Sequence, residues 1–532
     1  MHAAILSYFT GIFASNNLCC DDSLFDDFAP RVSDEQNVML DRPFNGEEVK
    51  TTLFSMFPDK APGPDGMNSG FYQQFWSVVG EDVTRFIMHA LNSGEFPEGL
   101  NDTNIILIPK KEVPETVADL RPIALSNVIY RIMAKMLTNR MKTLMSDLIS
   151  ESQSAFIPSR LITDNILVAA EVGHYLNRKQ CGAVGWSALK LDMSKAYDRM
   201  EWKFLERMLV VLGFSEKWIQ LIMLCVTTVN YTVMVNRCLE VEQADNFGKY
   251  LGLPSFVGRN KRAVFAYVEE KIRQRIGSWS KKMLSQAGKE VLLKSVAQSM
   301  PTFSMSIFLL PETVCQSIER TMNKFWWGSG RDRGIHWKAW DMLCVPKKYG
   351  GLSFKELRAF NLAMLGKQAW RFLTNPGSLA TRIYKARYYP TTGFVDATIG
   401  RCLSFCWRSI MAAHPTVTAG VRRRIGNGQS TLIWGHPWLP DGPSPLIQTN
   451  ILEELREARV TGLIDPQSST WDPHILSDIF IPEDVNRILK IPVSPDYDDS
   501  WYWMGDPKGT YTVKNAYRRI VGDFESNPGT FD

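Results

Sequence analysis

The chain has 532 residues, 45% of them hydrophobic, which excludes a wholly disordered protein and suggests two to four domains. The net charge of +4 is unevenly spread, since residues 1–240 carry −7, residues 241–440 carry +19 and residues 441–532 carry −8. The sequence has no apolar run near the ~18 residues that a membrane helix needs, so we expect no membrane contact.

The elements predicted in the first half alternate between helix and strand. The apolar stretch Ala3–Ala14 follows only His2, where a signal peptide has Lys or Arg, so it is interpreted as the start of a helix. Short apolar runs predict strands at Asn104–Ile108 and Ala188–Leu191. Apolar residues at three- and four-residue steps predict helices over Tyr130–Leu148 and Trp202–Leu212.

The second half is predicted to be helical from residue 261 to about residue 420. Breaks are expected at Pro301, Pro311 and Pro346. After Asp441 the Pro and Asp content rises, which predicts a linker. A strand fragment at Gly509–Val513 and a helix at Lys514–Val521 are expected to follow it.

The nine cysteines are scattered, and none forms a Cys-x-x-Cys pair. An odd number without such spacing is typical of a reduced chain, neither a disulfide framework nor a zinc site. We therefore expect an intracellular protein of the nucleus or the cytoplasm, with no bound zinc.

The central basic block, residues 241–440, is also rich in Trp, Tyr and Phe. Cations interleaved with aromatic rings suit a polyanion whose bases stack, such as single-stranded RNA. A solvated basic face over an aromatic core is the alternative. For Trp326, Trp327, Trp337, Trp340 and Trp370 the core is the favoured interpretation, and His336 is expected to be a packed or hydrogen-bonded imidazole, not a ligand.

Two cations follow the first predicted strand. Asn104–Ile108 leads through Pro109 to Lys110, and Arg121 stands ten residues after Lys111. The ammonium of Lys110 and the guanidinium of Arg121 could bind a triphosphate in a cleft, because both groups complement its oxygens. Two solvated surface cations are an equal alternative.

The segment Ala188–Asp198 carries the sharpest chemical pattern. Alternation places Leu189 and Leu191 on the packed side of a strand, and Lys190 and Asp192 on the other side. A carboxylate at the end of a buried strand could ligate Mg²⁺ at a nucleotide site. Without further context, a helix cap or a turn aspartate is the favoured alternative.

In this order, these segments closely resemble the reverse transcriptase of plant LINE-type (non-LTR) retrotransposons. Each motif is modest, but the ordered set is specific and covers nearly the whole chain. The matching segments are Lys60–Gly66, Leu107–Lys110, Leu120–Ile123, Gln153–Ile157 with Arg160 and Asp164-Asn165, Lys190–Asp198, Lys249–Gly252, Ala287–Val291, Phe325–Gly328, Gly350–Leu352 and Trp407–Ser409.

The resemblance implies an α+β right-hand polymerase that extends a DNA primer on an RNA template with two Mg²⁺ ions. Lys110 and Arg121 would then contact the nucleotide triphosphate. Asp192 would be the catalytic residue that holds a metal ion, and Tyr197 would be the steric gate that excludes a ribose 2′-hydroxyl. The implied domains are a linker remnant at 1–50, fingers at 51–180, a partial palm with the first catalytic motif at 181–236, a deletion junction at 237–260, a basic helical thumb and connection at 261–440, and a linker with the truncated start of a zinc-binding-like region at 441–532.

The second metal-binding motif of that family, a Phe-Ala-Asp-Asp hairpin, is missing from this sequence, as is the Gln-Gly-Asp-Pro segment before it. Thr232–Asn236 matches the family just before that region, and Ala244–Tyr250 matches sequence well beyond it. The acidic turn Cys20–Phe25 is no substitute, because a second apolar strand to close a hairpin is lacking. Since two-metal chemistry needs a second carboxylate, we expect an internally deleted and inactive enzyme without a full two-metal site.

The resemblance also implies truncation at both ends. The family places an endonuclease before the polymerase, and the segment Gly509–Lys514 resembles the opening of a zinc-binding region that here stops before any Cys/His cluster. Two alternatives to an inactive polymerase stay open. One is a non-catalytic nucleic-acid-binding remnant that uses Arg422, Arg423 and Arg424, and the other is an unstable product without function.

Overall fold

The structure is a computed structural model that describes residues 2–14, 21–110, 114–178, 188–189, 191, 193, 195–234, 249–250, 253–254, 257, 260–280, 284–328, 335–400, 403–439 and 444–522. The chain forms two compact units that alternate along the sequence. The first unit comprises residues 1–161 and 189–247, and the second comprises residues 162–188 and 248–532. Within the described ranges, each helix is too short or too polar to cross a membrane.

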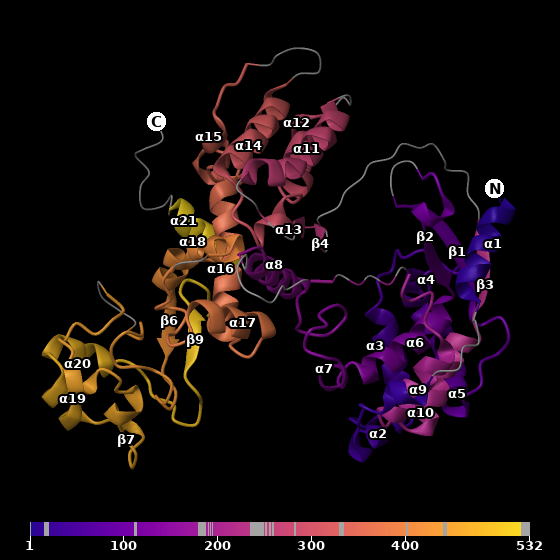
Figure 1. The fold of residues 1–532 in the computed structure, drawn as a ribbon, viewed down its shortest axis with the longest axis horizontal. Helices are drawn as coiled ribbons and strands as arrows, with labels where there is room; N and C mark the ends of the chain where they lie inside the picture. The colour runs from indigo at the N-terminus through magenta and orange to yellow at the C-terminus, as the bar shows by residue number, and fades with distance from the viewer. Residues whose placement is uncertain are drawn as a thin grey trace, which may run out of the picture. The chain divides into compact units, whose positions relative to one another are not determined.

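The first unit combines helices with a small mixed sheet (Figure 1). Its helices are α1 (His2–Phe13), α2 (Asp34–Asp41), α3 (Gly46–Phe54), α4 (Ser69–Gln74), α5 (Trp76–Ser93), α6 (Val128–Met141), α7 (Met145–Leu148), α9 (Trp202–Val211) and α10 (Glu216–Thr227). Its strands are β1 (Asp102–Pro109), β2 (Leu120–Ser126) and β3 (Asn230–Met234).

The sheet has the strand order β2-β1-β3. The central strand β1 runs antiparallel to β2, with Ile105 opposite Ala124, and parallel to β3, with Ile105 opposite Val233. Helix α1 packs beside β3, where the rings of Phe13 and Tyr231 lie 5.1 Å apart (Figure 1). Phe9 on the same helix is 1% exposed, so α1 is part of this unit.

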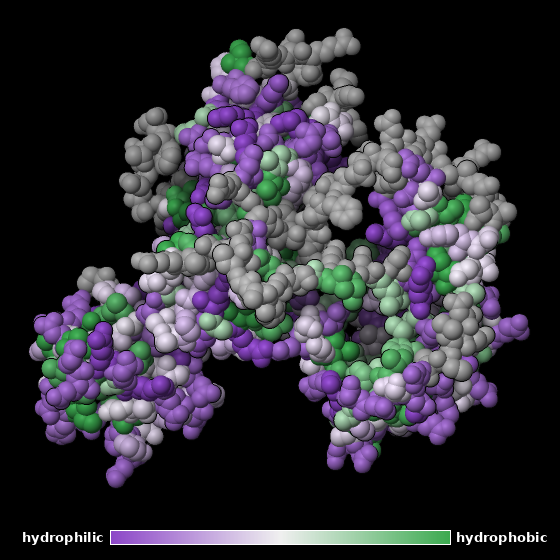
Figure 2. Space-filling model, viewed as in Figure 1, coloured by the Kyte–Doolittle hydropathy of each residue, from purple (hydrophilic) through white to green (hydrophobic). Residues whose placement is uncertain are grey.

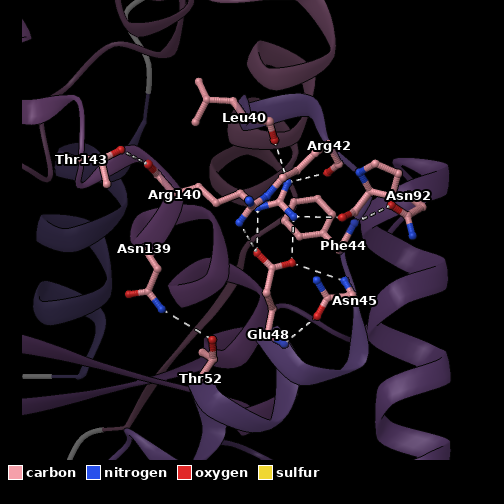
Figure 3. A network of polar contacts seen from close by, with 11 residues as sticks. Leu40, Arg42, Phe44, Asn45, Glu48, Thr52, Asn92, Asn139, Arg140 and Thr143 are labelled. Atoms are coloured by element: carbon pink, nitrogen blue, oxygen red, sulfur yellow. Dashed lines mark hydrogen bonds and ion pairs between the residues drawn. The ribbon is translucent and has the colours of Figure 1, made fainter. Parts of the chain in front are cut away.

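An arginine network fixes the helices of the first unit (Figure 3). Asn45 and Glu48 form a capping box at the start of α3. Glu48 also accepts hydrogen bonds from Nη2 and Nε of Arg140 on α6, at 2.8 and 3.1 Å. Arg140 Nη1 donates to the carbonyls of Leu40 and Arg42, and its guanidinium carbon lies 3.7 Å from the ring centre of Phe44. One buried cation thereby joins α2, α3 and α6.

The second unit is mainly helical. Its helices are α8 (Ile162–Arg178), α11 (Lys261–Ser280), α12 (Gln286–Leu292), α13 (Thr302–Met305), α14 (Glu312–Trp327), α15 (Trp340–Cys344), α16 (Leu357–Thr374), α17 (Leu379–Tyr388), α18 (Phe405–Gly420), α19 (Pro473–Ile479), α20 (Pro482–Ile488) and α21 (Val513–Val521). Its strands are β4 (Lys249–Tyr250), β5 (Leu253–Pro254), β6 (Val421–Arg424), β7 (Ile464–Asp465), β8 (Thr470–Trp471) and β9 (Ser500–Trp503).

Two hydrophobic cores hold the second unit. The larger one runs from α8 and α11 to α18 and α21 and contains Trp407, which is fully buried. The smaller one gathers residues between Ile425 and Ile488, including Trp438 and Leu476. Much of the region after Asp441, where the sequence predicted a linker, therefore packs into a core with α19 and α20.

Several sequence predictions can be compared directly with these elements. The strand predicted at Asn104–Ile108 is confirmed by β1, and the helix predicted at Trp202–Leu212 by α9. The prediction of a strand at Gly509–Val513 was wrong, because β9 ends at Trp503 and α21 begins at Val513. The helices predicted after residue 261 are confirmed, with Pro301 and Pro311 directly before α13 and α14.

Candidate functional site

The candidate site begins at one end of the sheet in the first unit. Arg121 on β2 lies opposite Ile108 on β1, and Lys110 continues β1 two residues beyond Ile108. Because side chains alternate along a strand, Lys110 and Arg121 belong to the same face. Both side chains are exposed, and Lys110 Nζ donates to the carbonyl of Ala118 at 2.8 Å. The two cations assigned to a triphosphate thus lie together.

The turn that follows Asp192 lies near Lys110. Asp192 itself is outside the described residues, as are Lys190 and Ser194. Lys195 adopts a left-handed backbone conformation, with a φ of 55°. Burial lowers the pKa of its ammonium, and the charge of Lys110 lowers it further. Sequence reasoning assigned no role to Lys195, although it belongs to the matched segment.

Helix α1 provides an aromatic lining for this turn. Lys195 Nζ lies 4.5 Å from the ring centre of Phe9 and 4.8 Å from that of Tyr8, and it has no hydrogen-bond partner among the residues that the structure describes. Such rings stabilise a cation over their faces, which offsets part of the cost of burying it. The apolar stretch Ala3–Ala14 gave the signal for a helix, but the sequence did not show what it covers.

The strand predicted at Ala188–Leu191 was wrong for the residues that the structure describes. Ala188, Leu189 and Leu191 belong to no strand, and Leu189 and Leu191 are 83% and 84% exposed. The sheet of the first unit has the strand order β2-β1-β3, and these residues do not belong to it. Tyr197 is 80% exposed, and its ring meets that of Phe156 edge-on at 6.2 Å.

The described residues around this turn do not fit a pair of Mg²⁺ ions. Lys195 has Lys110 and Arg199 as cationic neighbours and Asp198 as a carboxylate neighbour. Magnesium binds through carboxylate and phosphate oxygens, and two ions need more than one such carboxylate. Groups of three or more His, Cys, Asp or Glu able to hold a metal do not occur within the described ranges. Among the described side chains that act on Lys195, the cations Lys110 and Arg199 outnumber the carboxylate Asp198.

The three arginines of β6 have different environments, because a strand alternates its faces. Arg423 is 8% exposed, and its Nε donates to Thr431 Oγ1 at 3.1 Å. Its guanidinium carbon lies 4.9 Å from the ring centre of Trp501. Arg423 thus contributes to the fold. Arg424 is exposed and can reach an external anion, whereas Arg422 is half-buried and its Nη1 donates to the carbonyls of Ala419 and Val421.

A glycine loop next to β6 is closed by Asp499. Its carboxylate accepts hydrogen bonds from the backbone N–H groups of Gly426 and Gly428 at 2.8 and 2.9 Å, and from Thr431 Oγ1 at 2.8 Å. Burial alone would raise the pKa of Asp499, but these hydrogen bonds lower it below its ordinary value. The carboxylate is thus held ionised and orders the loop after the arginines.

The tryptophans of the basic block divide into two groups. Trp326 and Trp340 are each 8% exposed, as expected for core residues. Trp337 is 75% exposed, so the core interpretation was wrong for this residue. His336 is also exposed, which contradicts a packed imidazole there and leaves the hydrogen-bonded one as a prediction. The sequence predicted helix across this segment, but α14 ends at Trp327 and α15 begins at Trp340, so helical periodicity does not orient these side chains.

Comparisons with known proteins relate this chain to reverse transcriptases and to proteins of mobile elements. The reverse transcriptase (RNA-dependent DNA polymerase) family matches residues 108–254. An uncharacterised mitochondrial protein of Arabidopsis thaliana is 36% identical over 145 residues, which make up 27% of this chain and 94% of that protein.

Two relatives come from mobile elements. The uncharacterised 149 kDa protein of transposon TX1 from Xenopus laevis is 28% identical over 250 residues, 47% of this chain and 19% of that protein. The retrovirus-related Pol polyprotein from type-1 retrotransposable element R2 of Nasonia vitripennis is 25% identical over 160 residues, 30% of this chain and 14% of that protein. The chain therefore spans nearly all of the mitochondrial protein but less than a fifth of each mobile-element protein.

Proposed function

Because this chain belongs to the reverse transcriptase family of non-LTR retrotransposons, we propose that it is a polymerase-derived protein that binds RNA without copying it. In this proposal Lys110 and Arg121 are the nucleotide-binding cations of the ancestral polymerase, and Tyr197 is its steric gate. Asp192 is the first metal ligand. RNA template and DNA primer are the partners of the ancestral reaction.

The observation that carries this proposal is the charge around the catalytic turn. Lys110 and Arg199 both oppose the charged form of Lys195, and Asp198 is the carboxylate that favours it. The sequence passes from Asn236 to Ala244 without the hairpin that supplies the second metal ligand. One carboxylate cannot hold two Mg²⁺ ions against a triphosphate. Copying is therefore lost, while contacts to phosphate persist.

Primer extension on the purified full chain tests the loss of copying. With an annealed RNA template and DNA primer, deoxynucleotides and Mg²⁺, we expect no extended primer from the wild-type chain. An Asp192→Ala variant should behave in the same way. If the wild-type chain extends the primer and Asp192→Ala abolishes that extension, the proposal of an inactive polymerase is wrong.

RNA binding tests the retained activity. The basic block should bind RNA of any sequence, with an affinity that falls steeply with salt, because each neutralised phosphate releases counterions. Charge reversal at Arg422 or Arg424 should weaken binding and reduce the salt dependence. Arg456→Glu is the matched control, because Arg456 is exposed but lies in the acidic region after residue 441. Binding that is insensitive to salt would contradict this part of the proposal.

A chain without function is the remaining alternative, and its stability distinguishes it. The extensive cores of both units favour a folded protein. A cooperative thermal melt followed by circular dichroism is therefore expected. A gradual, uncooperative loss of helix signal would favour the unstable product instead.

A further inference from the structure

The second unit exposes one tryptophan in a region where it buries two others. Residues 335–339 are all exposed, and Trp337 and Ile335 are 75% and 69% exposed. Trp326 and Trp340, on either side along the chain, lie in the core. We propose that Trp337 is a stacking platform for the bases of single-stranded nucleic acid, and that lysines of the same surface hold its phosphates.

The backbone on the C-terminal side of this platform is fixed by contacts to both neighbouring segments. The Lys338 carbonyl accepts a hydrogen bond from Trp327 Nε1 on α14 at 3.2 Å. Lys338 Nζ donates to the carbonyl of Gly350 at 3.2 Å. Trp340 stacks on Phe354 with ring centres 4.9 Å apart and an interplanar angle of 7°. An aromatic ring carried by an already ordered segment loses less conformational entropy when a ligand binds.

The charge near Trp337 fits a polyanion. Lys338, Lys347 and Lys348 are exposed, and the contact of Lys338 with Gly350 brings it to the end of the short helix Lys347–Tyr349. Lys347 also pairs with Glu290 at 2.6 Å, so Lys338 and Lys348 are the cations assigned to phosphate. Among the described residues from Trp326 to Lys355, four are basic and one is acidic. Hydrophilic residues cover most of the face around α12 and α14 (Figure 2). The exposed lysines complement backbone phosphates, which favours nucleic acid as the partner of this surface.

Stacking on Trp337 and pairing of lysines with phosphates have different roles in binding. Every base has a π-face, so stacking on Trp337 tolerates any sequence, while ammonium groups neutralise backbone phosphates. A duplex hides its bases, so the platform selects single strands. This inference deepens the proposed RNA binding, on which it rests, because it assigns a base-contacting residue to a surface otherwise defined by charge.

The test measures binding of a labelled single-stranded RNA oligonucleotide to the full chain by fluorescence anisotropy over a series of salt concentrations. Trp337→Ala should weaken binding about fivefold or more at every salt concentration, with an unchanged salt dependence, because it removes a stacked base and no charge. Trp337→Phe should restore most of the affinity. Lys348→Gln should instead reduce the slope of log K against log[salt] by about 0.7.

Trp202→Ala is the matched control, because Trp202 on α9 is 46% exposed and lies in the first unit. It should bind as the wild type does. If Trp337→Ala also binds like the wild type while Arg424→Glu weakens binding, the stacking inference is wrong and the proposed RNA binding stands. If the wild-type chain binds no RNA, both fail.

A photochemical experiment covers the case in which Trp337→Ala does not fold. Ultraviolet irradiation of the wild-type complex should crosslink RNA to a peptide that contains Trp337, as identified by mass spectrometry. Crosslinks confined to other peptides would overturn the assignment. Protection of Trp337 by an unrelated protein, without any RNA crosslink, would indicate a protein-binding surface and would also overturn it.

Discussion

Arg140 shows how much one buried side chain can contribute in the first unit. Its side chain is 6% exposed, and it pairs with Glu48 while donating to three backbone carbonyls of residues 40–43 (Figure 3). We expect Arg140→Ala to lower the free energy of unfolding by about 3–5 kcal/mol, because Glu48 loses its buried partner. Urea denaturation of the full chain measures this loss.

The control for Arg140→Ala is Arg42→Ala, because both arginines pair with the carboxylate of Glu48. Arg42 also pairs with Glu48, at 3.3 Å, but its side chain is 59% exposed. A solvent-exposed pair contributes at most about 1 kcal/mol, so Arg42→Ala should have little effect. Equal losses in the two variants would show that burial does not decide the strength of the Arg140 network.

Glu319 on α14 gives the second unit a predictable dependence on pH. Burial, together with the charges of Glu356 and Asp341, raises its pKa to about 7, although the Leu357 N–H, which donates to it at 2.7 Å, opposes this shift. In the unfolded chain the pKa is near 4.5, so between pH 4.5 and 7 the folded state binds the extra proton. The stability that this proton contributes is therefore present below pH 4.5 and is lost as pH rises to about 7.

Glu319→Gln keeps the acceptor for Leu357 and removes the charge. The variant should melt at a higher temperature than the wild type at pH 8, and with a smaller difference at pH 5. Glu270→Gln on α11 is the control, because its side chain is 52% exposed, and it should show no such dependence. A wild-type melting temperature that rises steadily from pH 5 to pH 8 relative to Glu319→Gln would contradict the raised pKa.

At the scale of single elements, two helix glycines show how the effect of a Gly→Ala change on stability depends on the space around the new Cβ. A Cβ on Gly366 of α16 would lie 2.2 Å from Tyr511 Oη, whereas a Cβ on Gly277 of α11 would meet nothing within 4 Å. Gly366→Ala should therefore destabilise the chain by about 1–3 kcal/mol through overpacking. Gly277→Ala should stabilise it by up to about 1 kcal/mol. Thermal melts of both variants measure these opposite signs, and a shared sign would refute the argument.

The elements that sequence could predict are those with a strong local pattern. The apolar steps through Ile132, Met133 and Met136 predicted α6, because one buried face repeats every 3.6 residues. The strand predicted at Ala188–Leu191 was wrong, because a short apolar run does not show whether distant parts of the chain cover it. The exposed Trp337 and the buried Arg423 were missed for the same reason, since tertiary contacts alone decide which face a residue presents.

At the scale of the whole molecule, the two units are interleaved rather than consecutive. Helix α8 belongs to the second unit, although residues 189–247 of the first unit follow it in sequence. Its Leu167 is fully buried in the large core, and Asp164 pairs with both terminal nitrogens of Arg371 at 2.6 and 2.8 Å. Glu171 is 1% exposed and pairs with Arg387 at 3.1 Å.

A fragment of residues 249–532 should therefore be unstable by itself, because it lacks α8 and exposes the apolar surface that Leu167 covers. Adding a peptide of residues 162–178 should raise its melting temperature, since a ligand at a hundred times its Kd stabilises the folded state by about 2.7 kcal/mol. A Leu167→Asp peptide should fail to do so. A Tyr175→Ala peptide should succeed, because Tyr175 is 49% exposed. If the fragment alone melts as cooperatively as the full chain, α8 is dispensable and the interleaved arrangement has no bearing on stability.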